Sequence, residues 1–183
     1  MRFGQNFANT VRRKQPQRAD KWFLNAVVLT LKGRHHYRWR AVDQDGFTLD
    51  ILMQSRRNRH AAKRFFRKLM NHLRYTLRVI ITDKLKSYAA AKREILPSTE
   101  HRQHKGSNNR CEVSHRPTRQ QEKQMRQFQS PRHAQRFLST HAAINNLFRI
   151  RRFYATAPAY REARQHAFSI WHEASCAHGS NNA

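Results

Sequence analysis

The chain has few acidic residues, few cysteines and no long apolar run. Its 11 Asp and Glu residues stand against 37 Lys and Arg residues, which gives a formal net charge of +26. No segment approaches the ~20 consecutive apolar residues of a membrane span, and residues 1–8 lack the apolar core of a signal peptide. These absences argue against a membrane protein or a secreted one and predict a cytoplasmic protein.

Cysteine, glycine and proline are also scarce. The two cysteines, Cys111 and Cys176, lie far apart and match no disulfide framework, so both are expected to be reduced thiols. With only 5 Gly and 5 Pro, but 11 Phe and 3 Trp, the chain is not disordered throughout. A length of 183 residues and a hydrophobic fraction of 38% predict one domain with extensions.

The charge that is present points to a polyanionic partner. A protein of this charge repels itself unless an anion offsets the repulsion, and phosphate backbones are the first expectation. An anionic membrane surface is the weaker alternative. Two helical sets of basic residues could each be a solvated face, and we expect at least one of them to contact phosphate. The sets are Arg56, Arg57, Arg59, Lys63, Arg64, Arg67 and Lys68, and then Arg116, Arg119, Lys123 and Arg126.

Apolar patterning predicts the elements of the first half of the chain. Strands are expected over 21–31, 36–43 and 47–54, with a hairpin turn at Gln44-Asp45-Gly46. Asp43 and Asp45 belong to that turn rather than to a metal site, and Trp22, Trp39 and Phe47 are expected in the core. A basic helix over 58–72, a buried parallel strand over 77–82 and a helix over 85–96 follow.

The second half reads as a short strand over 99–103, a helix from 108 or 109 to about 128, and a helix opened by Ser130-Pro131. A last, weaker helix covers 158–174, and 175–183 is a frayed tail. Three antiparallel strands, then helix, strand, helix, strand and further helices, are the order of a ribonuclease-H-like α/β domain. The predicted division is a basic arm at 1–18, the core at 19–152 and a helical, frayed tail at 153–183.

Two carboxylates stand out in this basic chain. Asp83 follows the apolar run of the fourth strand, and Glu112 lies near the start of the predicted helix after residue 108. A carboxylate in a DNA groove repels phosphate unless a divalent cation lies between them, so the pair suggests metal-assisted phosphoryl transfer. The first strand, where a third carboxylate would belong, carries Asn25.

Several short sequence motifs together resemble those of the DDE-type transposases of bacterial insertion sequences, the group often called the IS-six family. The resemblance covers roughly residues 3–150. The matching motifs include Asp20-Lys-Trp22, Arg40-Ala-Val-Asp-Gln-Asp-Gly46, Ser55-Arg-Arg-Asn58, Ala61-Ala-Lys-Arg-Phe65, Thr82-Asp-Lys84, His101-Arg-Gln-His-Lys-Gly106 and Asn108-Asn-Arg110. The resemblance implies a ribonuclease-H-like integrase/transposase core that cleaves and joins DNA with three carboxylates and two divalent cations.

The resemblance also implies roles for individual residues. Asp83 and Glu112 match the second and third catalytic positions and would bind the metal. Asn25 occupies the first catalytic position, in the motif Leu24-Asn25-Ala26-Val27. Mg²⁺ or Mn²⁺ is therefore expected to bind weakly, and catalysis to be impaired. Arg119, seven residues beyond Glu112, would orient a phosphate. The expected DNA-binding residues are Arg119, Lys84, Arg116, Lys105 and Lys123.

Family members usually carry a helix-turn-helix domain before this core, and the chain begins about where that domain would end. We therefore expect an N-terminally truncated copy, in the cytoplasm of a bacterium and associated with the nucleoid. It would bind DNA as a homodimer or in a mixed assembly with full-length transposase. Two alternatives stay open: a non-catalytic DNA-binding remnant or inhibitor of the full-length enzyme, and an RNA-binding protein.

Histidines near the carboxylates have two interpretations. His101, His104, Cys111 and His115 are all zinc-ligand types, but their spacing is not that of common zinc modules. We expect His101 and His104 to line the DNA groove or to support the active-site loop.

Overall fold

The computed structural model describes residues 7–11, 20–72, 77–83, 86–103, 128–149 and 156–176. The chain divides into two compact units, one of residues 18–135 and one of residues 1–17 with 136–183. The first unit contains the β-sheet and is called here the core unit. The second is called the helical unit.

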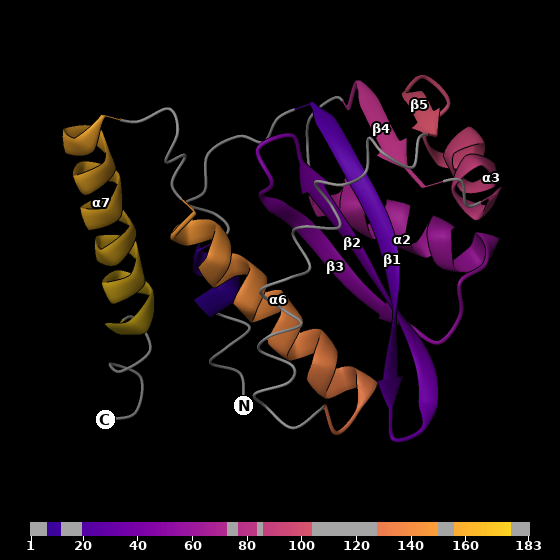
Figure 1. Ribbon diagram of the computed structural model, residues 1–183, viewed down its shortest axis with the longest axis horizontal. Coiled ribbons are helices and arrows are strands. Elements are labelled where there is room, and N and C mark those ends of the chain that lie inside the picture. The colour runs from indigo at the N-terminus through magenta and orange to yellow at the C-terminus, as the bar shows by residue number, and fades with distance from the viewer. Residues whose placement is uncertain are drawn as a thin grey trace. The chain divides into compact units, whose positions relative to one another are not determined.

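The core unit is built on a five-stranded sheet in the order β3-β2-β1-β4-β5 (Figure 1). Strands β1 (Lys21–Leu31), β2 (Arg34–Asp43) and β3 (Thr48–Gln54) form an antiparallel meander. Strands β4 (Val79–Thr82) and β5 (Glu100–Gln103) continue the sheet and run parallel to β1. The meander and the parallel β4 confirm the predicted order of strands.

Turn chemistry sets the two hairpins of the meander. Lys32 and Gly33 join β1 to β2 with φ of 48° and 75°, the positive values that a two-residue hairpin loop requires. In the second hairpin a carboxylate oxygen of Asp43 accepts hydrogen bonds from the amides of Asp45 (3.0 Å) and Phe47 (2.9 Å). The predicted turn role of Asp43 is confirmed.

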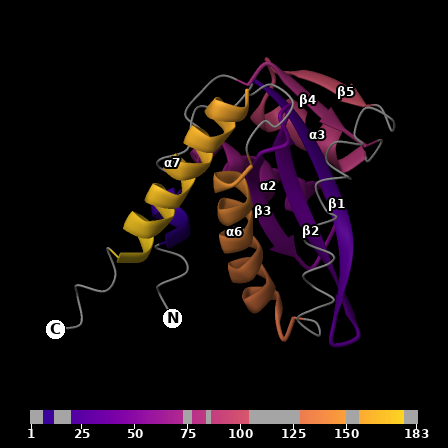
Figure 2. The same ribbon diagram turned by 60° about the vertical axis from the view of Figure 1, so that its left-hand side comes forward.

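Two helices cover one face of the sheet. The helices α2 (Arg59–His72) and α3 (Lys86–Ile95) lie on the same side of it in both views (Figures 1 and 2). Phe65, Phe66 and Tyr88 pack there against Trp22 and Trp39, and all five side chains are fully buried. The core role of both tryptophans is therefore confirmed, whereas Phe47 is only half-buried.

The opposite face of the sheet carries a smaller apolar cluster of Phe23, Val42, Val79 and Ile81. Residues alternate between the two faces of a strand, so Asn25, two residues beyond Phe23, lies on this second face. The first face thus anchors the helices, and the second presents the candidate active site.

The helical unit contains most of α6 (Pro131–Leu147) together with α7 (Ala157–Cys176). The Ser130 hydroxyl accepts a hydrogen bond from the His133 amide (3.1 Å), which confirms the predicted N-cap before Pro131. Residues 7–11 are helical as well, and Phe7 packs on Trp171 with ring centroids 5.0 Å apart.

Residues 7–11 lie within the predicted basic arm at 1–18 and form a short helix with buried apolar side chains. Phe7, Ala8 and Val11 are buried against Ala143 and Ile170. The prediction rested on the basic composition of the neighbouring residues and overlooked three apolar positions at helical spacing. The boundaries at residues 18 and 152 stay predictions.

Candidate active site

The register of the two parallel strands brings two predicted site residues together. Leu24 of β1 pairs with Thr82 of β4, so Asn25 and Asp83 are the next positions along the two strands. Neighbouring strands lie about 4.8 Å apart. Asn25 is 9% exposed, and the Asp83 side chain is 28% exposed. The fold thus places an amide beside a carboxylate at the carboxyl end of β4.

Asp83 is paired with a cation that the sequence did not indicate. The guanidinium of Arg57, from the loop between β3 and α2, donates a hydrogen bond to Asp83 Oδ2 at 2.7 Å. The sequence had grouped Arg57 with the basic residues of the following helix. The two residues are 26 positions apart, and no local pattern links them.

A second set of contacts fixes the strand end that carries Asp83. The Thr82 hydroxyl donates a hydrogen bond to the Asp83 carbonyl oxygen (2.8 Å) and lies 2.9 Å from His101 Nε2 on β5. Since Thr82 has one hydroxyl proton, His101 must donate from Nε2. Burial, with a smaller contribution from the nearby charge of Lys92, lowers the pKa of His101 and favours this neutral donor form. His101 thus contacts the strand end that carries Asp83, and its expected place in the DNA groove or against the active-site loop stays a prediction.

The remaining predicted site residues lie outside the described residues. They are Glu112, Lys84, Lys105, Arg116, Arg119 and Lys123, and His104, His115 and Cys111 also lie there. Their roles stay predictions. Within the ranges that the structure describes, no group of three or more His, Cys, Asp or Glu side chains could hold a metal ion.

The described donors do not fit a pair of divalent cations. Asp83 and Asn25 both offer oxygen atoms, which Mg²⁺ and Mn²⁺ prefer. Together, however, they bring one negative charge, and Arg57 already lies against it. Two metal ions about 4 Å apart need several carboxylates to offset their charge. In the part of the chain described here, the cation beside Asp83 is a guanidinium.

Other acidic side chains among the described residues of the core unit are also paired with cations. Asp20 pairs with Arg78 and Glu100 with Arg102, each at 2.6 Å, and these hydrogen bonds lower the pKa of both carboxyl groups. Asp50 pairs with Lys68 at 2.6 Å. The few acids are thus neutralised locally, and the surplus of positive charge stays available to a polyanion.

Fold and geometry together define a class. Three antiparallel strands continue into two parallel strands, helices cover one face, and an aspartate ends the strand beside β1, as in ribonuclease-H-like nucleic-acid enzymes. The model of a DDE domain family, that of IS240-type transposases, matches residues 19–151. The chain therefore belongs to the DDE transposases of bacterial insertion sequences, as the sequence motifs indicated.

Similar proteins agree with this assignment. The chain is 28% identical over 170 residues to the transposase for insertion sequence-like element IS431mec of Staphylococcus aureus strain Mu50, across 90% of this chain and 70% of the relative. The same values hold for the transposase of element IS257 in transposon Tn4003 from Staphylococcus aureus. Both relatives are named insertion-sequence transposases, and transposases of this family act on DNA and generally use divalent metal ions.

A solved structure supports the fold. A chain of the cryo-EM structure of the simian T-cell lymphotropic virus intasome in complex with PP2A regulatory subunit B56 gamma matches with a TM-score of 0.53. The sequences are 12% identical, and the match covers 75% of this chain and 51% of that chain. The predicted ribonuclease-H-like fold is thereby confirmed. No helix in the described ranges is long and apolar enough to cross a membrane.

Proposed function

We propose that this chain binds duplex DNA as a member of the insertion-sequence transposases whose catalytic centre is weakened. The observation that carries the proposal is the pair formed by Asn25, within β1, and Asp83, at the end of β4. Asn25 stands beside Asp83, where the family resemblance implies an aspartate, and the Asp83 carboxylate is occupied by Arg57. The ancestral reaction would be hydrolytic cleavage of DNA, followed by attack of the freed 3′-hydroxyl on a phosphate of the target strand, whose own 3′-oxygen leaves.

Asp83 and Glu112 would be the acidic catalytic positions, with Asn25 as the degenerate first position. A divalent ion bound there would stabilise the developing charge on the reacting phosphate. The described donors supply too little charge for two such ions, so Mg²⁺ or Mn²⁺ should bind weakly. DNA binding would depend instead on basic side chains, with Lys84, Lys105, Arg116, Arg119 and Lys123 as candidates.

A second candidate function follows from the same observation. A copy that binds DNA but cleaves it poorly would act as a non-catalytic partner in a homodimer or in a mixed assembly with full-length transposase. The Arg57–Asp83 ion pair at 2.7 Å favours this candidate, because it neutralises the carboxylate without metal and lets a phosphate approach.

The test measures binding and cleavage of the same labelled duplex in EDTA and in Mn²⁺. We expect the dissociation constant to be nearly equal in both buffers and nicking to be slow or absent. Rapid Mn²⁺-dependent cleavage would show an intact catalytic centre and exclude the weakened one. If structured RNA displaces the duplex at lower concentration than unlabelled DNA does, the RNA-binding alternative is the better one.

A further inference from the structure

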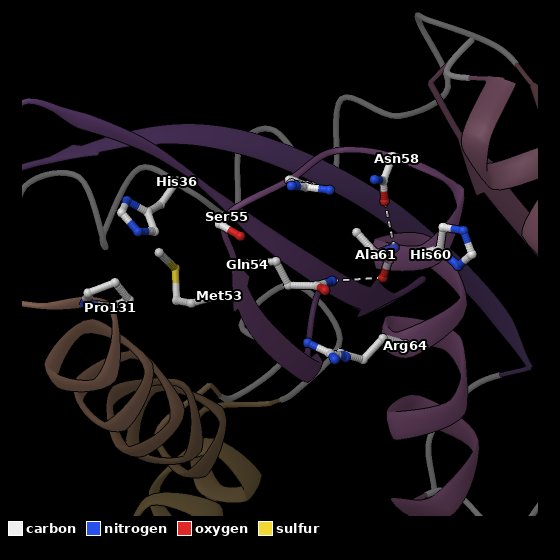
Figure 3. A pocket seen from close by; sticks show the side chains of 10 residues that line it. His36, Met53, Gln54, Ser55, Asn58, His60, Ala61, Arg64 and Pro131 are labelled. Carbon is white, nitrogen blue, oxygen red and sulfur yellow. Dashed lines mark hydrogen bonds between the residues drawn. The ribbon is translucent and has the colours of Figure 1, made fainter.

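A cavity of about 480 Å³ lies at the end of β3 in the core unit. Its walls come from β2, β3, the loop between β3 and α2, the first turns of α2, and Pro131 (Figure 3). Four of its lining side chains are of basic types, and no lining side chain is acidic. The four are His36, Arg56, His60 and Arg64.

The two arginines of the cavity differ from the other cations of this region. On α2, Arg59, Lys63 and Arg67 all pair with Glu94 of α3. The hydrogen bonds from Lys63 and Arg59 lower the pKa of Glu94. Lys68 pairs with Asp50, and Arg57 pairs with Asp83. Among the described residues, Arg56 and Arg64 have no acidic partner. Their charges are the ones left for an external anion.

Hydrogen bonds hold the wall between these arginines in place. The Gln54 side-chain amide donates to the Ala61 carbonyl oxygen (2.7 Å), and the Ala61 amide donates to Asn58 Oδ1 (3.0 Å), as Figure 3 shows. The loop of residues 55–58 is therefore tied to α2 at both of its ends. A binding group on a fixed backbone loses less freedom when its ligand arrives.

The same loop links the cavity to the candidate active site. Arg56 lines the cavity, while the next residue, Arg57, holds Asp83. Consecutive Cα atoms are about 3.8 Å apart. A ligand bound at Arg56 thus contacts the same loop whose next residue is hydrogen-bonded to the end of β4.

We propose that this cavity binds a backbone phosphate of the DNA strand and sets the position of that strand relative to Asp83. Guanidinium groups bind phosphate through paired hydrogen bonds, and Ser55 adds a hydroxyl donor at the rim. The inference rests on the proposed function, since it takes the phosphate from DNA. A free nucleotide offers the same chemistry, and the experiment below separates the two sources.

The experiment compares two double variants of the full chain. R56A/R64A removes the two cations that lack acidic partners, and R59A/R67A removes two cations of the same helix region that pair with Glu94. Both variants lose two positive charges from exposed positions, and both should keep the fold by circular dichroism and thermal melting. Binding of a short duplex is measured at several salt concentrations, and binding of AMP is measured in parallel.

We expect R56A/R64A to bind the duplex more weakly and to lose about 0.9 from the magnitude of its log–log salt slope, the contribution of the one phosphate that the cavity would neutralise. R59A/R67A should keep the slope of the natural chain. Equal slopes in the two variants would overturn the cavity proposal while leaving DNA binding intact. No duplex binding by the natural chain would overturn both proposals. AMP binding that exceeds duplex binding at equal phosphate concentration would assign the cavity to a free nucleotide instead.

Discussion

At the scale of single residues, the site is defined by what offsets the charge of Asp83. An aspartate at position 25 would add a second carboxylate next to it, and that pair would require a metal ion. With the neutral Asn25 in this place, one guanidinium is enough to offset the negative charge of Asp83, and Arg57 supplies it at 2.7 Å. The charge of Asp83 is therefore offset without a metal ion, although the family generally uses divalent ions.

Replacing Asn25 by Asp should have opposite effects in the absence and presence of metal. Without metal the new carboxylate, at a position only 9% exposed, should raise carboxyl pKa values and cost about 1–3 kcal/mol of stability. With Mn²⁺ the variant should gain affinity and show a larger rise in Tm than the natural chain, because stabilisation grows as RT ln(1 + [L]/Kd). Thermal melts of both proteins across a Mn²⁺ titration measure this.

Arg57→Gln provides the matching comparison. It removes the internal cation that competes for Asp83, so it should also enlarge the Mn²⁺-dependent shift, whereas Arg59→Gln should not. The pair is partly exposed, so its loss alone should cost about 1 kcal/mol or less. Equal metal-dependent shifts in the natural chain and in Asn25→Asp would show that position 25 is not at the metal site.

His101 should give the core unit an acid-sensitive stability. Burial lowers its pKa in the folded state, so the unfolded chain takes up a proton at a higher pH than the folded chain does. Stability should be full above about pH 6.5, the ordinary histidine value, and should fall as the pH drops toward the lowered value. In His101→Gln, which keeps a donor for Thr82, this part of the loss should disappear.

Urea unfolding between pH 7.5 and 5 measures the effect of His101. His166→Gln, at an exposed position of α7, is the control and should keep the pH dependence of the natural chain. The same acid-side slope in His101→Gln and in the natural chain would contradict the assignment.

At the scale of elements, local patterns predicted most of the fold. The strand over 21–31 is observed with the predicted bounds, and the helix expected over 58–72 is observed as Arg59–His72. These helices and strands can be predicted because apolar residues recur with the period of a helix or a strand. The Asp-Gly and Ser-Pro pairs mark a turn and the start of a helix. The order of these elements then indicated the ribonuclease-H-like connection of the strands, and the resemblance implied the same fold.

The candidate site was only partly accessible to the same reasoning. Asn25 and Asp83 could be named because each ends or interrupts an apolar strand, and the observed register makes them neighbours. The Arg57–Asp83 pair and the cavity beside Arg56 join segments that are distant in sequence. They arise from tertiary packing, which side-chain spacing along one segment does not encode.

The packing of α2 on the sheet should dominate the stability of the core unit. Phe65 is fully buried, and its ring centroid lies 6.0 Å from that of Trp39. Phe65→Ala leaves a cavity and should cost about 3–5 kcal/mol of unfolding free energy. Val28→Ala, at a position of β1 that is 46% exposed, should change it by about 0.5 kcal/mol or less. Urea unfolding followed by circular dichroism compares the two, and similar costs would contradict the core described here.

At the scale of the whole molecule, the dominant quantity is the net charge of +26. The described acidic side chains of the core unit are already paired or hold a turn, so they do little to reduce repulsion between the remaining cations. Such a chain is destabilised by its own charge and stabilised by any polyanion that binds it. The same charge therefore links folding stability to DNA binding.

This link predicts opposite responses to salt. Raising NaCl from a dilute buffer to about 0.15 M shortens the screening length to about 8 Å, so the Tm of the free protein should rise. Over the same range the affinity for duplex DNA should fall, with a log–log slope of about −0.9 for each phosphate neutralised. Thermal melts and fluorescence anisotropy on one preparation test both, and potassium glutamate at equal ionic strength controls for ion-specific effects. A DNA affinity that does not change with salt would mean that the net charge does not drive binding, and a Tm that falls would mean that the folded chain already balances its own repulsion.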